Sequence, residues 1–153
     1  MRFLGGTRPR EACEKELAEF LAEADRGLGY WAGFMEREFA GYWILRVPES
    51  SESVDSQASD GVGELGYRVL PRYWRRGLGS EGSRELLRYG FEDLGLSKIV
   101  AFTAAKNAAS QAIMASVGMD FVREFEVDAA GWPEGTDLHG VEYAISAKDL
   151  SLR

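Results

Sequence analysis

The residues best suited to chemistry lie in one stretch at positions 64–81, ELGYRVLPRYWRRGLGSE. Alternating apolar residues predict a strand at 64–70, which Pro71 ends because proline has no backbone N–H to donate. A loop with two arginines follows, and a helical pattern begins at Gly79. Glycines leave the backbone open to a ligand, and the unpaired N–H groups of a helix start point toward it. Together with the helix dipole and the arginine charges, this stretch predicts a site for phosphate oxygens.

A second pair of candidates, Asn107 and Ser110, follows a mostly apolar strand predicted at 97–103. The predicted helix at 79–94 joins this strand to the first one in a right-handed crossover, so the two strands are expected to be parallel. Open α/β sheets bind ligands at the carboxyl ends of such strands, where both candidates would lie. Asn107 either caps the next helix, predicted at 108–117, or holds a ligand amide. Ser110 lies one turn into that helix.

The remaining elements predict a single mixed α/β domain over residues 1–153. We expect an amphipathic helix at 7–25 capped by Thr7, a hairpin of strands at 30–35 and 41–47, an acidic loop at 48–63, and a second hairpin of strands at 120–127 and 138–146. This order predicts a mostly antiparallel sheet with a central parallel strand pair and helices on both faces.

The run GLGSEG at 77–82 also matches the G-x-G-x-x-G pattern of dinucleotide-binding folds. Three features argue against an oxidoreductase of that kind. Six residues, PRYWRR, separate the glycines from the strand, no acidic residue ends the next strand, and the chain opens with a helix and antiparallel strands. A Walker A loop is excluded because no Gly-Lys-Ser/Thr follows. A purely structural role for the glycines, in close helix packing, stays open.

Composition excludes several classes of function. The net charge of −7 argues against a nucleic acid partner. Cys13 is the single cysteine and His139 the single histidine, which excludes an internal disulfide and multi-histidine or thiolate metal sites, so we expect no metal. No apolar run approaches the roughly 20 residues of a membrane span, and the N-terminus does not resemble a signal peptide. We therefore expect a cytoplasmic protein without a membrane partner.

The stretches at 64–81 and 107–121, the second reading NAASQAIMASVGMDF, resemble the GCN5-related N-acetyltransferase (GNAT) superfamily. The resemblance is strongest to the branch of the RimJ/RimL ribosomal-protein N-terminal acetyltransferases, and it covers nearly the whole chain. The superfamily's pyrophosphate motif is Q/R-x-x-G-x-G/A; here Trp74 fills the first place, as is usual for this branch, and Gly77 and Gly79 follow. The resemblance implies a GNAT-like acyl-CoA N-acyltransferase fold, acetyl-CoA as the donor and no metal.

The resemblance also implies where the donor would bind. Its pyrophosphate would rest on the amides of residues 76–80, and its pantetheine arm would pair with the backbone of Val69 and Leu70 and be positioned by Asn107. The implied cofactor-binding residues are Val69, Leu70, Arg75, Arg76, Gly77, Leu78, Gly79, Ser80, Asn107 and Ser110.

The implied reaction is direct attack of a primary amine, on a protein N-terminus or a small molecule, through a tetrahedral intermediate. It requires a base, an oxyanion donor and an acid for the departing thiolate. Glu64 is the candidate base, a backbone N–H near Val69 the oxyanion donor, and Ser110 the candidate acid. Trp31 and Trp43 lie on the hairpin that would flank the acceptor. We assign most of the aromatic residues of this hairpin to the core.

One feature departs from that branch, whose members normally carry a further strand and helix before a stretch like MRFLGG at 1–6. Three interpretations stay open: a shortened gene, a native short form completed by a partner chain, or a protein that binds CoA without turnover. The alternative function is therefore a non-catalytic CoA-binding or interaction protein with a truncated acceptor site. An uncovered sheet edge also favours self-association, so we expect a homodimer.

Overall fold

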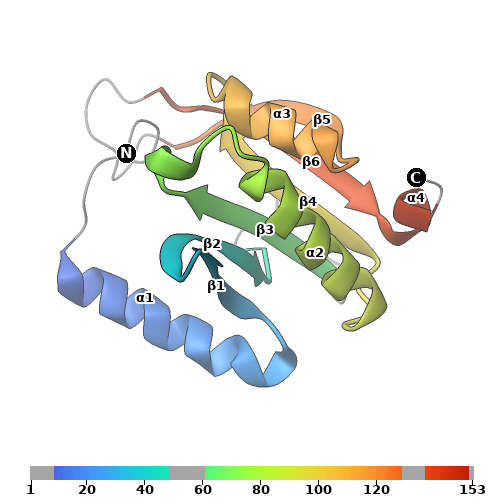
Figure 1. The fold of residues 1–153 in the computed structure, drawn as a ribbon. Coiled ribbons are helices and arrows are strands. Elements are labelled where there is room, and N and C mark those ends of the chain that lie inside the picture. Colours follow the sequence, from blue (N-terminus) through green and yellow to red (C-terminus); the bar gives the residue numbers. More distant parts are fainter. Residues whose placement is uncertain (1–8, 49–60, 129–136, 152–153) are drawn as a thin grey trace.

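A computed structural model describes residues 9–48, 61–128 and 137–151, and Figure 1 shows how its elements are arranged. Six strands form one sheet in the order β1-β2-β3-β4-β6-β5. The helices are α1 (Arg10–Glu23), α2 (Leu78–Glu92), α3 (Ala108–Ser116) and α4 (Ala147–Ser151), with 3-10 turns at Ala24–Arg26 and Pro71–Tyr73. The strands are β1 (Gly29–Met35), β2 (Glu38–Arg46), β3 (Val62–Val69), β4 (Lys98–Ala104), β5 (Asp120–Glu126) and β6 (His139–Ser146). Every predicted helix and strand is present, and α4 is an addition.

The first hairpin joins β1 and β2 through a tight turn. Glu36 and Arg37 have φ angles of 50° and 72°, the left-handed values that a two-residue turn of the favoured hairpin type requires. We predicted a longer connection over 36–40, whereas β2 already begins at Glu38. The hairpin itself is confirmed, with β1 and β2 antiparallel.

The centre of the sheet is the parallel pair of β3 and β4, which the sequence predicted. The pairing joins three residue pairs, from Val62 with Lys98 to Glu64 with Val100. Beyond Glu64, β3 continues to pair with β2 as far as Val69. The two parallel strands are therefore hydrogen-bonded at their beginnings and separate toward their carboxyl ends.

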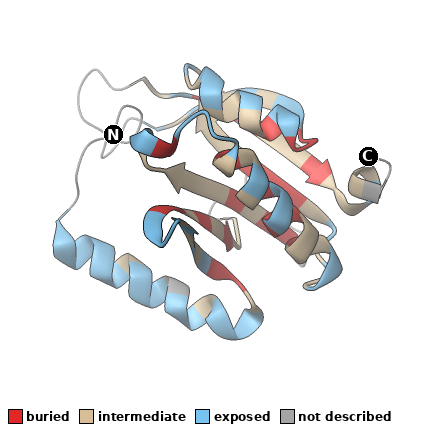
Figure 2. Ribbon diagram, in the orientation of Figure 1, coloured by how far each residue is buried: buried red, intermediate tan, exposed pale blue. Residues whose placement is uncertain are grey.

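The helices α2 and α3 lie side by side on one face of the sheet, as Figure 1 shows. The buried apolar core between them and the sheet appears in red in Figure 2. It contains Leu45, Leu65, Leu86, Leu87, Ile99, Ala101, Met114 and Ile145. We expected helices on both faces; the two that pack on the centre of the sheet share one face, and α1 contacts β1 at its edge. The mixed sheet and its parallel pair confirm the predicted fold class.

Helix α2 approaches the sheet closely at its glycines. A Cβ on Gly82 would overlap the indole ring of Trp43, which is 7% exposed. A Cβ on Gly90 would lie 2.8 Å from Ile99 Cδ1. The close-packing role considered for the glycines at 77–82 therefore applies at Gly82, and Gly90 packs on the sheet in the same way, so the two glycines together set the depth at which α2 lies.

The first helix is far more exposed than an amphipathic pattern predicts. Leu17 and Leu21, which belong to the apolar face that the amphipathic pattern predicts, are 50% and 66% exposed. Pro9 is the residue before α1, and the proposed cap Thr7 lies outside the described residues. The predicted loop at 48–63 lies mostly outside them too, except that Val62 and Gly63 belong to β3.

The opposite face of the sheet carries charged and aromatic side chains. Arg46 pairs with Glu64 at 2.8 Å, and Arg123 pairs with the buried Glu142 at 2.7 Å.

No helix among the described residues is long and apolar enough to span a membrane.

Candidate functional site

The separation of β3 from β4 leaves backbone groups of β3 facing an opening. The N–H of Leu70 donates to the Ala40 carbonyl at 2.8 Å, so Leu70 turns its backbone groups toward β2. Because these groups alternate along a strand, those of Tyr67 and Val69 point the other way, toward β4. The pairing with β4 ends at Glu64, so the N–H of Val69 faces the opening.

The end of β3 is held by two hydrogen bonds from the segment that follows it. The Trp74 indole Nε1 donates to the Val69 carbonyl at 2.7 Å, and the Tyr73 N–H donates to the Leu70 carbonyl at 2.9 Å. Both backbone groups of Leu70 therefore have partners in the chain. Of the two residues predicted to pair with an extended ligand, Val69 presents its N–H to the opening.

The start of α2 has the unpaired backbone N–H groups that the sequence predicted there. Gly77 precedes the helix with φ 81°, and the first helical bond runs from the Glu81 N–H to the Gly77 carbonyl at 2.9 Å. The N–H groups of Leu78, Gly79 and Ser80 thus precede that bond and have no carbonyl one turn earlier to reach. Apart from Gly77 itself, its chain neighbours and the adjoining helix backbone, no atom of the described residues lies within 4 Å of the position that a Cβ on Gly77 would take.

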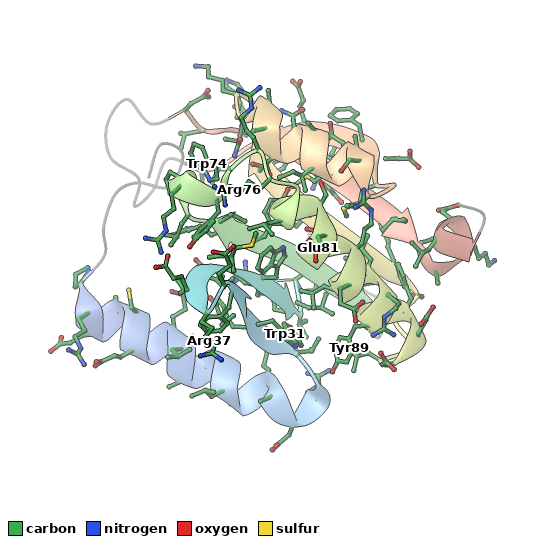
Figure 3. All side chains as sticks on the ribbon, in the orientation of Figure 1. Trp31, Arg37, Trp74, Arg76, Glu81 and Tyr89 are labelled. Carbon is green, nitrogen blue, oxygen red and sulfur yellow. The ribbon has the colours of Figure 1, made fainter. Side chains whose placement is uncertain are left out.

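Two arginines lie directly before this helix start. Arg75 and Arg76 are exposed, and Arg75 has a left-handed φ of 61°. The Arg76 guanidinium lies 5.6 Å from the centre of the Tyr73 ring, and Figure 3 shows Arg76 beside Trp74 at this end of the molecule. Their charges add to the positive end of the helix dipole, so the loop and helix start suit an anion.

The beginning of α2 is fastened to α3. A Cβ on Gly79 would lie 2.7 Å from Ile113 Cδ1, so the two helices approach each other closely at this glycine. The Ser80 Oγ lies 2.9 Å from the Ser116 Oγ, and Ser116 donates to the Ile113 carbonyl at 2.7 Å. Since the latter bond uses the Ser116 proton, Ser80 donates to Ser116.

The first turn of α3 brings the second pair of candidates beside β3. Asn107 caps the helix, with its Oδ1 accepting from the Ser110 N–H at 3.2 Å. Of the two alternatives predicted for Asn107, a helix cap or a contact with a ligand amide, the structure shows the helix cap. The Ser110 Oγ lies 2.9 Å from the hydroxyl of Tyr67, which also donates to the Ser110 carbonyl at 3.0 Å. Burial raises the pKa of Tyr67 to about 12 because it disfavours the phenolate.

Sequence reasoning placed Tyr67 in a strand and assigned it no part in the site. The alternation of Leu65, Tyr67 and Val69 did place the three side chains on one face. Which helix covers that face depends on the position of α3 in space, which no local pattern reveals. The structure therefore adds Tyr67 to the candidates.

The candidate base lies on the other face of the sheet. Glu64 accepts a hydrogen bond from Arg46 Nη2 at 2.8 Å, and the two side chains are 14% and 20% exposed. The guanidinium balances the charge of the carboxylate in this half-buried position. The side chains of Glu64 and Ser110 thus lie on opposite sides of the opening between β3 and β4.

A groove of about 270 Å³ lies between the first hairpin and α2. Its walls include Trp31, Phe34, Trp43 and Leu78, with Glu81 at the rim, and Figure 3 labels Trp31 and Glu81. Trp43 is buried, and its indole N–H donates to the Gly79 carbonyl at 3.4 Å. The groove is apolar and adjoins the start of α2. Among the described residues, no cluster of three or more His, Cys, Asp or Glu side chains could hold a metal ion.

Known proteins resemble this chain both in sequence and in fold. The family model for the acetyltransferase (GNAT) domain matches residues 1–120. The FsC-acetyl coenzyme A-N(2)-transacetylase of Aspergillus fumigatus is 38% identical over 123 residues, which are 80% of this chain and 52% of that protein. The chain spans about half the length of the curated relatives it matches.

Solved structures match the fold at low sequence identity. The structure of yncA from Salmonella typhimurium with acetyl-CoA has a TM-score of 0.74 at 19% identity, over 95% of this chain and 79% of that one. RimL, the ribosomal L7/L12 alpha-N-protein acetyltransferase, in complex with CoA has a TM-score of 0.73 at 16% identity, over 91% and 73%. The match of the family model over 1–120 shows that the chain belongs to the GNAT acetyltransferase family, and the solved structures agree with it in fold.

Proposed function

We propose that this protein transfers an acetyl group from acetyl-CoA to a primary amine, either a protein N-terminus or a small-molecule amine. One observation carries the proposal: β3 and β4 pair over three residues and then separate beside the Gly77 helix start. An extended thioester ligand with a pyrophosphate needs both features, a backbone edge for its arm and a cationic amide cluster for its phosphates.

The residues present suit acetyl-CoA. The pyrophosphate would be held by the amides of residues 76–80 with Arg75 and Arg76, while Val69 would offer its N–H to the pantetheine arm. The space beside Gly77, open to 4 Å, is consistent with a ligand there. Asn107 would act indirectly, because its Oδ1 is bonded to the helix it caps.

Bound acetyl-CoA supplies an activated thioester, and the chain supplies the proton acceptor and donors around it. Glu64 would accept the proton that the attacking amine loses. A backbone N–H near Val69, such as that of Tyr67, which also faces the opening, would stabilise the developing oxyanion, and the Ser110 hydroxyl would donate a hydrogen bond to the departing thiolate. Because Glu64 and Ser110 lie on opposite faces of the sheet, the amine would approach from the Glu64 side and the sulfur would lie on the Ser110 side.

Thermal unfolding with acetyl-CoA, CoA and NAD, each in turn, tests the donor. A ligand at 100 times its Kd stabilises the folded state by roughly 2.7 kcal/mol, which raises the Tm by about 5–10 °C for a chain of this size. We expect a shift with both CoA species, and a much smaller one when Arg75 and Arg76 are replaced by glutamate. A shift with NAD alone would overturn the proposal.

The alternative is a protein that binds CoA without turnover. The ion pair of Glu64 with Arg46 favours it, because a base in this position must release its arginine to act. Release of free CoA thiol from acetyl-CoA, measured with a panel of peptides and small amines, separates the two. Turnover with any amine supports the transferase, whereas saturable CoA binding without turnover across the panel supports the alternative.

We further propose that residues 1–153 act as one domain, that the protein is cytoplasmic, and that it forms a homodimer through β1. The strand β1 lies at one edge of the sheet and is bordered by exposed aromatic side chains, including Phe34 at 65% exposure. Open edges and exposed apolar side chains both favour pairing with a second copy.

A further inference from the structure

The hydroxyl of Tyr67 connects β3 to the first turn of α3. It lies within hydrogen-bond distance of two atoms of the same residue, the Ser110 Oγ at 2.9 Å and the Ser110 carbonyl at 3.0 Å. Tyr67 belongs to the part of β3 that has separated from β4, two residues before Val69. Its side chain thus reaches α3 at the opening where the donor arm is expected.

The two hydroxyls share two protons, which permits two arrangements of their hydrogen bonds. In the first, Tyr67 donates to the Ser110 carbonyl and the Ser110 hydroxyl donates to Tyr67. In the second, Tyr67 donates to the Ser110 Oγ, which frees the Ser110 proton for another acceptor. A change from the first arrangement to the second lets the Ser110 hydroxyl donate to a ligand instead of to Tyr67, and only the two hydroxyl protons need to rotate.

The phenol remains a donor over the working pH range. Burial raises the pKa of Tyr67 to about 12, so the hydroxyl keeps its proton at neutral pH. A phenol that ionises so reluctantly is a poor source of protons for a thiolate, whose own pKa is near 8.5 in an unperturbed thiol. Its role is therefore to orient and polarise Ser110, while Ser110 contacts the sulfur.

We propose that Tyr67 is a positioning residue that holds the Ser110 hydroxyl as a hydrogen-bond donor to the sulfur of CoA, an assignment that rests on the proposed function. When the thioester is cleaved, the C–S electron pair goes to sulfur, and the thiolate accepts a hydrogen bond from Ser110. Tyr67 then donates to the Ser110 Oγ, and no proton leaves the pair.

The test measures the ionisation of the CoA thiol while it is bound, from the ultraviolet absorbance of the thiolate as a function of pH. A hydrogen bond to the charged form lowers a pKa, so both Ser110→Ala and Tyr67→Phe should raise the thiol pKa, by up to about one unit. The double variant should match Ser110→Ala alone, because Tyr67 acts through Ser110.

Tyr89→Phe is the matched control. The Tyr89 hydroxyl also donates to a backbone carbonyl, that of Gly27 at 2.9 Å, so this variant loses a similar hydrogen bond away from the site. It should lower the Tm and leave the thiol pKa unchanged. With any amine that is turned over, Tyr67→Phe should lower kcat by roughly tenfold and leave KM for acetyl-CoA nearly constant.

The other outcomes distinguish the two proposals. An unchanged thiol pKa in Tyr67→Phe would overturn the positioning role, as would a rise in Tyr67→Phe that is absent from Ser110→Ala. Lack of saturable CoA binding by the wild-type protein would overturn the proposed function itself, and this assignment with it.

Discussion

At the scale of single residues, Glu64 and Glu142 form an instructive pair. Both are carboxylates on neighbouring parts of the same sheet face, and each is bonded to one arginine, at 2.8 and 2.7 Å. Glu64 lies where β3 and β4 begin to separate. Glu142 lies on β6, opposite Phe102 of β4 in the strand register, where the two strands are paired. Their position relative to the opening between β3 and β4, rather than their chemistry, separates a candidate base from a structural ion pair.

Glu64→Gln should lower kcat by about 100-fold or more, because glutamine keeps the shape but accepts no proton from the amine. KM for acetyl-CoA should change by less than about twofold, since the side chain lies across the sheet from Ser110. Glu142→Gln is the matched control and should cost stability while leaving kcat nearly constant. Steady-state kinetics and Tm measurements check both. A Glu64→Gln enzyme with wild-type kcat would remove this residue from the mechanism.

Tyr67 should make the stability depend on pH in the alkaline range. Its pKa is raised from 10 to about 12 on folding, so the folded state retains a proton that the unfolded chain loses between these values. Stability from this group is complete below about pH 10 and falls as the pH rises toward 12. Urea unfolding near pH 9 and near pH 11 should show that the wild type loses on the order of 1 kcal/mol more than Tyr67→Phe. Equal losses in the two proteins would mean that Tyr67 ionises as an exposed phenol.

The sequence pattern identified most of the candidate residues but not the side chains that they contact. Glycines, arginines and an Asn-x-x-Ser pattern are local signals, and the structure places them at the start of α2 and of α3. Arg46 and Tyr67 are separated from Glu64 and Ser110 by 18 and 43 residues, so their contacts depend on how strands and helices pack. No periodicity along the chain encodes such pairs.

At the scale of elements, local signals set the type of each element more reliably than its limits. The predicted strand at 64–70 is β3 at Val62–Val69, and the predicted helix at 79–94 is α2 at Leu78–Glu92. The short helix α4 had a signal that we did not use. Ser146 and Asp149 form a reciprocal cap, because Asp149 Oδ2 accepts from the Ser146 N–H and Ser146 Oγ accepts from the Asp149 N–H, each at 3.4 Å, as the spacing S-x-x-D permits.

The depth of α2 on the sheet leads to a prediction at Gly82. Alanine favours a helix by about 1 kcal/mol over glycine, yet its Cβ would overlap Trp43, so Gly82→Ala should destabilise the fold by about 1–3 kcal/mol. Chemical unfolding of Gly82→Ala, Trp43→Phe and the double variant measures the coupling. The double variant should lose less than the sum of the two, because the smaller ring leaves room for the methyl group.

Gly66→Ala is the matched control for this prediction. A Cβ there would lie 3.5 Å from Ile44 Cδ1, an ordinary contact, so its effect should stay within about 0.5 kcal/mol. Additive losses at Gly82 and Trp43 would contradict the overlap and attribute the cost to the helix backbone instead.

At the scale of the whole molecule, the order of strands follows from handedness. Right-handed crossovers carry the chain from β3 over α2 to β4, and from β4 over α3 to β5 in the same direction. This places α2 and α3 on one face and leaves room for β6 between β4 and β5, antiparallel to both. The sequence predicted the C-terminal hairpin, but the insertion of β6 beside β4 depends on this global arrangement.

The sheet has two edges, β1 and β5, and each carries an exposed phenylalanine that contacts one other aromatic ring. Phe34 is 65% exposed and packs edge-to-face on Phe39, and Phe121 is 53% exposed and packs likewise on Tyr143. The β1 edge differs in having the exposed leucines of α1, Leu17 and Leu21, on an element that contacts it. A second copy paired along β1 would therefore cover more apolar surface than one paired along β5.

Light scattering over a range of protein concentrations should accordingly show a dimer that Phe34→Glu dissociates and Phe121→Glu does not. The exposed position of each ring allows the charge to stay in water in the monomer, so neither variant should lose much stability. In a dimer through β1, the carboxylates introduced by Phe34→Glu in the two copies would be brought near each other and to apolar surface, which opposes association. Dissociation by Phe121→Glu instead would place the interface at β5, and a wild-type protein that stays monomeric would exclude both edges. Because the proposed CoA site lies on β3, β4 and α2 of one chain, the monomeric Phe34→Glu variant should still show the full thermal shift with CoA.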